Sequence, residues 1–400
     1  MSAQTDSLRK FAILATRAKM HAKARELWQR LVAADGTDAA AHFNLANAAS
    51  SLGAVDAALE SYDAAIEATT DASLQQACRA NASCACIKAR RPEHALDYCR
   101  AGDSPTVMYN LNTALRQLGR QGEAIRITWA KIRESAPPRL RAYIDSPKPA
   151  RTIVAPASTS ITVVCVKWGA KYDAEYVNKL GRACRRHLQG CGKLVCFTDD
   201  AEGLGDIVEA RPLPSTSMQA WWLKAYLFSK AARLAGPVLY LDLDTVVCGD
   251  LGPLAALAAS SNLVKMRRPT SRRWRRLVPA RHSHADAQAT LGTTALRNEN
   301  RAGGYNSSVL AWTAPRFGAV WDLLDEPGAY ESVARAVYKF DHWLEMLVED
   351  ATIVQDETGA VVEYASMAEE WPPPGASVVC FPLTPKPHEV HTAFIREHWV

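Results

Sequence analysis

The sequence predicts two regions, an all-α helical repeat region followed by a domain of the α/β class in which helices cover a largely parallel sheet. Three observations support this fold class. Amphipathic helical patterns recur along residues 1–136, strand and helix patterns alternate over residues 161–400, and residues 137–160 between them hold five prolines with little periodicity. We therefore expect residues 137–160 to form a linker, extended in part by its prolines. The 400 residues also exceed the usual size of one hydrophobic core.

The clearest repeat covers residues 42–68, which read as two amphipathic helices broken at Leu52–Gly53. Weaker copies begin upstream near Ala24 and downstream at 109–125, with a degenerate unit around 92–96. The small Ala58, and the period of about 34 that relates it to Ala24, resemble a tetratricopeptide repeat. The resemblance covers residues 8–134 and implies a superhelix whose concave face binds a protein partner. An all-helical spacer that packs against the neighbouring domain is the alternative.

The composition is that of a globular chain, with 48% hydrophobic and 22% charged residues. A net charge of +5 does not by itself indicate nucleic acid, and we expect none as a partner. Residues 1–19 lack the apolar core and cleavage site of a leader, and no stretch approaches about 20 apolar residues, so we expect a cytoplasmic protein or one peripheral at a membrane. The ten cysteines form no Cys-x-x-Cys pair, which indicates reduced thiols and no zinc site.

Two carboxylates, Asp242 and Asp244, interrupt the apolar run 238–247. A spacing of two places both on one face of a strand. Such close like charges raise one another's pKa unless a positive charge lies between them. A hard divalent cation, Mn²⁺ or Mg²⁺, fits because it takes few carboxylates and completes its shell with water and phosphate oxygens. The pair therefore predicts a nucleotide-diphosphate site, with a solvated strand end as the alternative.

Strand and helix patterns alternate around this pair, with strands at 161–166 and 194–198 and helices at 174–188 and about 217–234. In open α/β sheets, ligands bind beyond the carboxyl ends of the strands. We therefore expect Lys167–Trp168, Asp199–Asp200 and the Asp242–Asp244 pair to border one crevice.

Seven short motifs carry a more specific signal: VVCVKWG at 163–169, YVN at 176–178, CFTDD at 196–200, WWLK at 221–224, LYLDLDT at 239–245, YNSSV at 305–309 and KPH at 386–388. Together they resemble bacterial glycosyltransferases of the GT-A fold, near the retaining family that includes glycogenin-like and galactosyltransferase enzymes. The resemblance spans about residues 161–390. It implies a Rossmann-like GT-A domain over residues 161–400 that binds a nucleotide-sugar donor, with uridine as the expected base.

The resemblance also implies roles for individual residues. Asp242 and Asp244 would bind Mn²⁺ or Mg²⁺, which bridges the donor diphosphate and neutralises the leaving group. Lys167, Trp168 and Tyr172 would border the nucleoside, although Trp168 could equally be a packed loop residue.

Four further residues would act on the sugar. Lys224 would reach the phosphate or the sugar hydroxyls and assist catalysis, with a surface lysine as the alternative. Asn306 and Ser307 would hold donor-sugar hydroxyls, because amides and hydroxyls can both donate and accept hydrogen bonds. Asp341 would steady the positive charge that develops in glycosyl transfer, with a helix-surface aspartate as the alternative.

One position departs from the family pattern. Relatives carry a third metal-ligating histidine before the Lys-Pro-His segment, where this sequence has Pro382. Proline cannot bind a metal, so His388 replaces the ligand, water fills the position, or metal binding is weakened. Lys386 remains and would pair with the diphosphate.

A basic stretch follows the Asp pair and contains Lys265, Arg267, Arg268, Arg272, Arg273, Arg275, Arg276 and Arg281, with Trp274 among them. An anionic acceptor, such as an anionic glycan or a lipid-linked phosphate, or an anionic membrane surface would explain it. A solvated loop is the commoner meaning of such a run.

These observations predict a glycosyltransferase that moves a sugar from a nucleotide-diphosphate donor to a hydroxyl acceptor, with retention implied by the resemblance alone. The competing hypothesis is a catalytically impaired transferase-like domain that serves, with the repeats, as a protein-binding scaffold. A nucleotidyltransferase ranks third, because residues 167–170 are not a glycine-rich phosphate loop.

Overall fold

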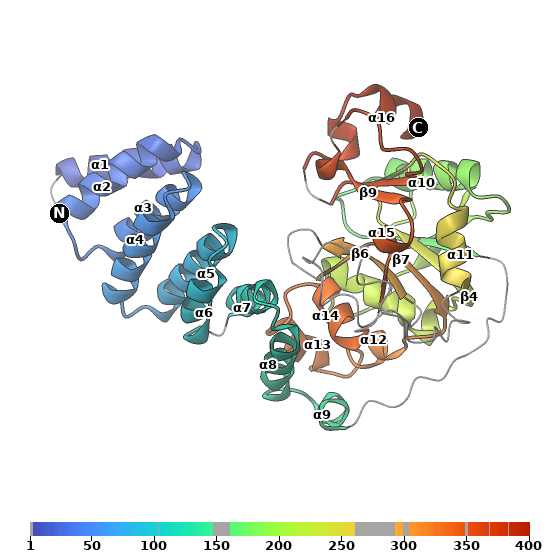
Figure 1. The fold of residues 1–400 in the computed structure, drawn as a ribbon, viewed down its shortest axis with the longest axis horizontal. Helices are drawn as coiled ribbons and strands as arrows, with labels where there is room; N and C mark the ends of the chain where they lie inside the picture. Colours follow the sequence, from blue (N-terminus) through green and yellow to red (C-terminus); the bar gives the residue numbers. More distant parts are fainter. Residues whose placement is uncertain are drawn as a thin grey trace, which may run out of the picture. The chain divides into compact units, whose positions relative to one another are not determined.

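The computed structural model describes residues 3–102, 104–146, 161–260, 293–298, 304–348, 351–367, 369–382 and 384–400. The chain divides into two compact units (Figure 1). The helical unit comprises residues 1–135 and 332–338, and the α/β unit comprises 136–331 and 339–400. None of the described helices is both long and apolar enough to cross a bilayer.

The helical unit is built from successive helix hairpins. Its helices are α1 (Ala3–Arg17), α2 (His21–Ala34), α3 (Ala39–Ser51), α4 (Val55–Glu67), α5 (Ala72–Lys88), α6 (Pro92–Arg100), α7 (Pro105–Gln117) and α8 (Gln121–Arg133). Each helix packs on the next, so the apolar face of every hairpin is covered by its neighbours. A helical repeat region thus precedes the α/β unit.

An alanine recurs at the same place in the second helix of every hairpin. Ala24, Ala58, Ala95 and Ala124 are each at most 1% exposed. The backbone N–H of each donates to the carbonyl of the residue that caps its helix. Because only a methyl group lies at this position, the two helices of the hairpin can approach closely.

The turns between the paired helices share one backbone conformation. The residue before each cap has a positive φ, at 56° for Lys19, 75° for Gly53, 60° for Arg90 and 73° for Gly119. Glycine adopts this left-handed region freely, whereas Lys19 and Arg90 do so against the repulsion of their Cβ atoms. The turn geometry is therefore kept even where the sequence opposes it.

The linker expected at 137–160 is helical at its start. Helix α9 (Pro138–Asp145) has a proline at its first position, where the missing N–H costs no hydrogen bond. The carboxylate of Glu326 accepts the N–H groups of Arg139 and Leu140, both at 3.2 Å, and Leu140 is fully buried. Residues 138–145 of the expected linker are therefore helical and not extended, and residues 147–160 lie outside the described part of the chain.

A seven-stranded sheet forms the centre of the α/β unit, in the order β3-β2-β1-β4-β7-β6-β8. The strands are β1 (Thr162–Lys167), β2 (Leu194–Thr198), β3 (Val208–Pro212), β4 (Gly236–Leu241), β6 (Thr293–Asn298), β7 (Gly304–Ala314) and β8 (Thr352–Ile353). The first four of these are parallel, but β7 runs antiparallel to both β4 and β6. The sheet is therefore mixed and less parallel than expected, since the apolar pattern of a strand does not encode the direction of its partner.

Each face of this sheet carries its own core. The face of Leu239 and Val309 packs on α10 (Ala174–His187) and α11 (Gly252–Ser260). On the opposite face Trp312 is fully buried and stacks on Phe228, with 4.7 Å between ring centroids. That face is covered by η1 (Ala220–Phe228), α12 (Ala319–Asp322) and α14 (Phe340–Leu347), with η2 (Lys230–Ala232) and α13 (Ala329–Ala334) nearby in the chain.

The single helix expected at about 217–234 is instead the pair of 3-10 helices η1 and η2, separated at Ser229. Helical propensity and apolar content do not distinguish the two helix types, so the sequence pattern does not separate them. In the structure η1 contacts α12 and α14.

A small second sheet, β5-β10-β9, holds the carboxyl-terminal part of the chain. Its elements are β5 (Thr245–Val247), β9 (Val361–Glu363) and β10 (Val378–Cys380), accompanied by α15 (Val354–Glu357), η4 (Tyr364–Ser366), η5 (Pro387–Glu389) and α16 (Ala393–His398). Because β5 follows directly after β4, the Asp242–Asp244 segment joins the two sheets.

Candidate active site

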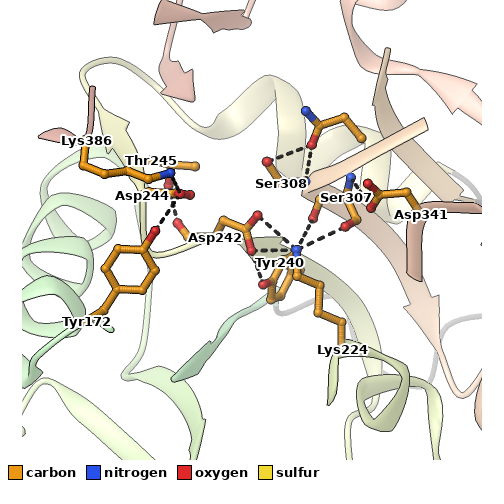
Figure 2. A network of polar contacts seen from close by, with 11 residues as sticks. Tyr172, Lys224, Tyr240, Asp242, Asp244, Thr245, Ser307, Ser308, Asp341 and Lys386 are labelled. Atoms are coloured by element: carbon orange, nitrogen blue, oxygen red, sulfur yellow. Dashed lines mark hydrogen bonds and ion pairs between the residues drawn. The ribbon is translucent and has the colours of Figure 1, made fainter. Parts of the chain in front are cut away.

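Asp242 and Asp244 lie in the tight turn between β4 and β5 (Figure 2). They were expected on one face of a continuous strand, but β4 ends at Leu241 and the chain then changes sheets. The backbone holds this turn firmly, because Asp242 N donates to Ser308 O at 2.8 Å and the Thr245 hydroxyl donates to Asp242 O at 2.7 Å. The turn fixes the directions of the two carboxylates independently of a strand pleat.

The Asp242 carboxylate binds a lysine and a tyrosine. Lys224 Nζ lies 2.8 Å from Oδ1 and 3.0 Å from Oδ2, and the Tyr240 hydroxyl donates to Oδ1. Lys224 is only 9% exposed, and its ammonium group also donates to Ser307 Oγ at 3.1 Å. Burial, followed by the negative charge of Asp242, raises the pKa of Tyr240. Tyr240 therefore remains a hydrogen-bond donor to the carboxylate at physiological pH.

The Asp244 carboxylate has a separate pair of donors. Lys386 Nζ lies 2.6 Å from Oδ2 and the Tyr172 hydroxyl lies 2.9 Å from the same oxygen. Burial and then the charge of Asp242 raise the pKa of Asp244, and Lys386 and Tyr172 oppose that rise. Tyr172, expected to border a nucleoside, is thus bound to a carboxylate in this structure.

Polar groups from β7 and α14 lie on the other side of Lys224 (Figure 2). Ser307 N donates to Asp341 Oδ1 at 3.2 Å. Asn306 Oδ1 accepts from both the backbone and the hydroxyl of Ser308, and its amide group donates to Glu363 Oε1 at 3.1 Å. The structure therefore connects Asp242, Lys224, Ser307 and Asp341 in one chain of contacts.

Lys167 and Trp168 belong to the neighbouring strand end. Lys167 is 4% exposed and donates to Asp200 O at 3.2 Å, while Asp199 Oδ2 accepts from Gly169 N at 2.8 Å. Trp168 is half-buried. These contacts join the ends of β1 and β2, and none of those described connects Lys167 to the carboxylate pair, so a crevice bordered by all three strand ends stays a prediction.

His388, proposed as a metal ligand, is engaged elsewhere. Its Nδ1 atom pairs with the Tyr176 hydroxyl. Within the described residues, no group of three or more His, Cys, Asp or Glu side chains is arranged to hold a metal ion, so the structure does not bring His388 together with Asp242 and Asp244. Pro382, half-buried, supplies no ligand in its place.

Sequence reasoning missed two contributors. Tyr240 precedes Asp242 by two residues, and this period-two spacing in an apolar strand was a usable signal. Glu363, which receives the Asn306 amide, comes from β9 and had no sequence signal. The basic stretch of residues 265–281 lies outside the described residues.

The turn carries two carboxylates, and the ammonium groups of Lys224 and Lys386 bind them. Polar groups of β7 and α14, which could bind sugar hydroxyls, lie next to Lys224. Two carboxylate oxygens suffice for a hard divalent ion that keeps several waters and takes phosphate oxygens. Asp242 and Asp244 are thus the side chains that would hold Mn²⁺ or Mg²⁺.

No protein-family model matches this chain, and no curated protein is significantly similar to it. Among solved structures, the glycosyltransferase GlyE of Streptococcus pneumoniae TIGR4 matches 58% of this chain and 58% of its own length, at 15% identity and a TM-score of 0.38. YrrB, a TPR protein with an unusual peptide-binding site, matches 34% of this chain and 70% of its own, at 17% identity and a TM-score of 0.27. MamA MSR-1 matches 32% of this chain and 74% of its own, at 21% identity and a TM-score of 0.27.

Proposed function

We propose that the α/β unit is a glycosyltransferase that moves a sugar from a nucleotide-diphosphate donor, with uridine as the expected base, to a hydroxyl acceptor. The observation that carries this proposal is the chain of contacts from Asp242 through Lys224 to Ser307 and Asp341. It combines groups suited to a diphosphate with groups suited to a sugar, at the carboxyl end of a central parallel strand.

The diphosphate would lie at the Asp242–Asp244 turn. Mn²⁺ or Mg²⁺ held by the two carboxylates would supply charge neutralisation for the leaving group. Lys386 and Lys224 carry the positive charges that a diphosphate also needs, since ammonium groups bind phosphate oxygens as point charges. A donor phosphate that binds Lys386 would replace the Lys386–Asp244 ion pair with a Lys386–phosphate ion pair, so Lys386 would keep a negatively charged partner.

The sugar would lie against Asn306, Ser307 and Asp341. In the transfer, the acceptor oxygen bonds to the anomeric carbon while the bond from that carbon to the diphosphate breaks, and the acceptor proton passes to the departing diphosphate. Positive charge develops on the sugar as the bond breaks, and the carboxylate of Asp341 stabilises that charge. Retention of configuration remains part of the proposal on the basis of the sequence resemblance.

Calorimetric titration of UDP- and GDP-sugars, with Mn²⁺ and then with a chelator, tests the proposal. We expect one donor to bind with metal, and Asp244→Ala to weaken that binding at least tenfold. Asp206→Ala is the matched control, because Asp206 is an exposed aspartate of the same unit. Equal affinity in Asp244→Ala and Asp206→Ala would remove the metal assignment.

A second candidate is a transferase-like scaffold without turnover, with the helical repeats binding a protein partner. Pro382 favours it, because a proline stands where the sequence resemblance implies a third metal-ligating histidine. A folded protein that binds no donor in the same titration would support this candidate and refute the transferase.

A further inference from the structure

The face of η1 that carries Lys224 ends at an exposed aromatic ring. Side chains at i and i+3 of a 3-10 helix eclipse one another, so Leu227, Lys224 and Trp221 form one row. Exposure rises along this row from 1% at Leu227 through 9% at Lys224 to 39% at Trp221. At about 2 Å of rise per residue, the Trp221 backbone lies about 6 Å beyond that of Lys224 along the helix axis. The row therefore begins in the core, passes the site and ends at solvent.

Helix α14 approaches the same ring from a second direction. Lys339 occupies the N-cap position of α14, and its Nζ lies over the Trp221 ring, 6.0 Å from the ring centroid. Two residues later in the chain, Asp341 accepts the Ser307 N–H at 3.2 Å. Trp221 is thus linked to the site through both η1 and α14.

The next residue, Trp222, shows that η1 is held in place although Trp221 is exposed. Trp222 is 4% exposed and packs edge-on against Tyr330 and Phe340, with ring centroids 5.5 Å and 6.5 Å away. These contacts anchor η1 against the start of α14. With η1 fixed in this way, the outward position of Trp221 is a defined feature of the surface.

We propose that Trp221 and Lys339 form the acceptor subsite, which takes a pyranoside that carries a negative charge. This inference rests on the proposed transferase function. An indole ring offers a broad apolar face on which the C–H face of a pyranose can lie, while the sugar hydroxyls stay in water. The Lys339 ammonium lies over the same ring, and its charge favours an acidic or phosphorylated sugar. Such a sugar would place its hydroxyl next to the donor sugar at Ser307 and Asp341.

Ligand-observed NMR titration with methyl β-D-glucopyranoside and methyl β-D-glucuronide tests the subsite in the full-length protein. We expect both to bind the wild type, the glucuronide more tightly, and Trp221→Ala to weaken both about tenfold. Lys339→Met should weaken the glucuronide several-fold and leave the glucoside unchanged. Trp371→Ala is the control, since Trp371 is similarly exposed at 44% and lies beside Phe394 and His398 in another part of the α/β unit.

Donor affinity is measured by calorimetry in the same samples, which separates the two proposals. Suppose that the wild type and Trp221→Ala bind the donor with equal affinity. If the two proteins also bind the glycosides with equal affinity, or do not bind them, the subsite is refuted and the donor site stands. If the wild type binds no donor, the transferase itself fails. Equal affinity of the wild type for the two glycosides would remove Lys339 from the subsite.

Discussion

Replacing Lys224 with methionine should destabilise the α/β unit, because it leaves the Asp242 carboxylate without its positively charged partner. The variant keeps the length of the side chain but leaves Asp242, with Asp244 nearby, without its ammonium partner at 2.8 Å. Removing one member of a buried ion pair typically costs about 3–5 kcal/mol. The Asp242 side chain retains 21% of its exposure, so water relieves part of this penalty and we expect about 3 kcal/mol.

The assay is thermal and urea unfolding followed by tryptophan fluorescence, with the transition of the α/β unit analysed separately from that of the helical unit. For a unit of this size, about 3 kcal/mol corresponds to a fall in Tm of roughly 6–12 °C. Lys230→Met is the matched control, since Lys230 is exposed in the adjacent helix η2, and its Tm should not change.

A double variant separates the charge from the packing. Lys224→Met combined with Asp242→Asn removes both charges and should recover stability to within about 1 kcal/mol of the wild type, because neutral replacements of buried pairs are often tolerated. Donor binding should still be lost. A Tm for Lys224→Met equal to that of Lys230→Met, or a double variant no more stable than the single one, would refute the reasoning.

Other predictions concern the turns, caps, thiols and metal. Both Gly53 and Arg90 have positive φ, which glycine adopts more readily than other residues. Gly53→Ala should therefore lower the free energy of unfolding of the helical unit by about 1 kcal/mol, and Arg90→Gly should raise it by about 0.5 kcal/mol. Urea titration that gives changes of the same sign for both variants would contradict this. Asp71→Ala removes the cap that accepts Ser73 N at 2.8 Å and should cost about 1 kcal/mol in the same titration. Burial raises the pKa of the Cys99 thiol to about 11, so below that pH it stays neutral, and its alkylation by iodoacetamide at pH 9 should require unfolding; rapid labelling of the folded protein would show otherwise. Removing divalent ions with a chelator should lower donor affinity at least tenfold, and calorimetry that detects no change would argue for a site in which the lysines suffice.

The residues of the candidate site were largely accessible from the sequence, but their pairing was not. Asp242 and Asp244 were visible because carboxylates in an apolar run are rare, and Lys224 because it lies in an aromatic cluster. Their assignment to separate lysine partners depends on Lys386, which is 142 residues from Asp244 in the chain. His388 pairs with Tyr176, a contact that its motif did not indicate, and its role as a metal ligand stays a prediction.

Local periodicity sufficed for the helical hairpins and for strands such as β2, because a repeating apolar pattern reports directly which residues face a core. Periodicity was insufficient where the structure depends on contacts with segments distant in the sequence. The direction of β7 depends on its partners β4 and β6, and α9 is held by the distant Glu326. The 3-10 form of η1 has no sequence signature that separates it from an α-helix. The sequence thus specified which side chains are available for chemistry and in which elements they lie. Long-range packing specified the distances between them, because a contact between Lys224 and Ser307 exists only once two strands and a 3-10 helix have met.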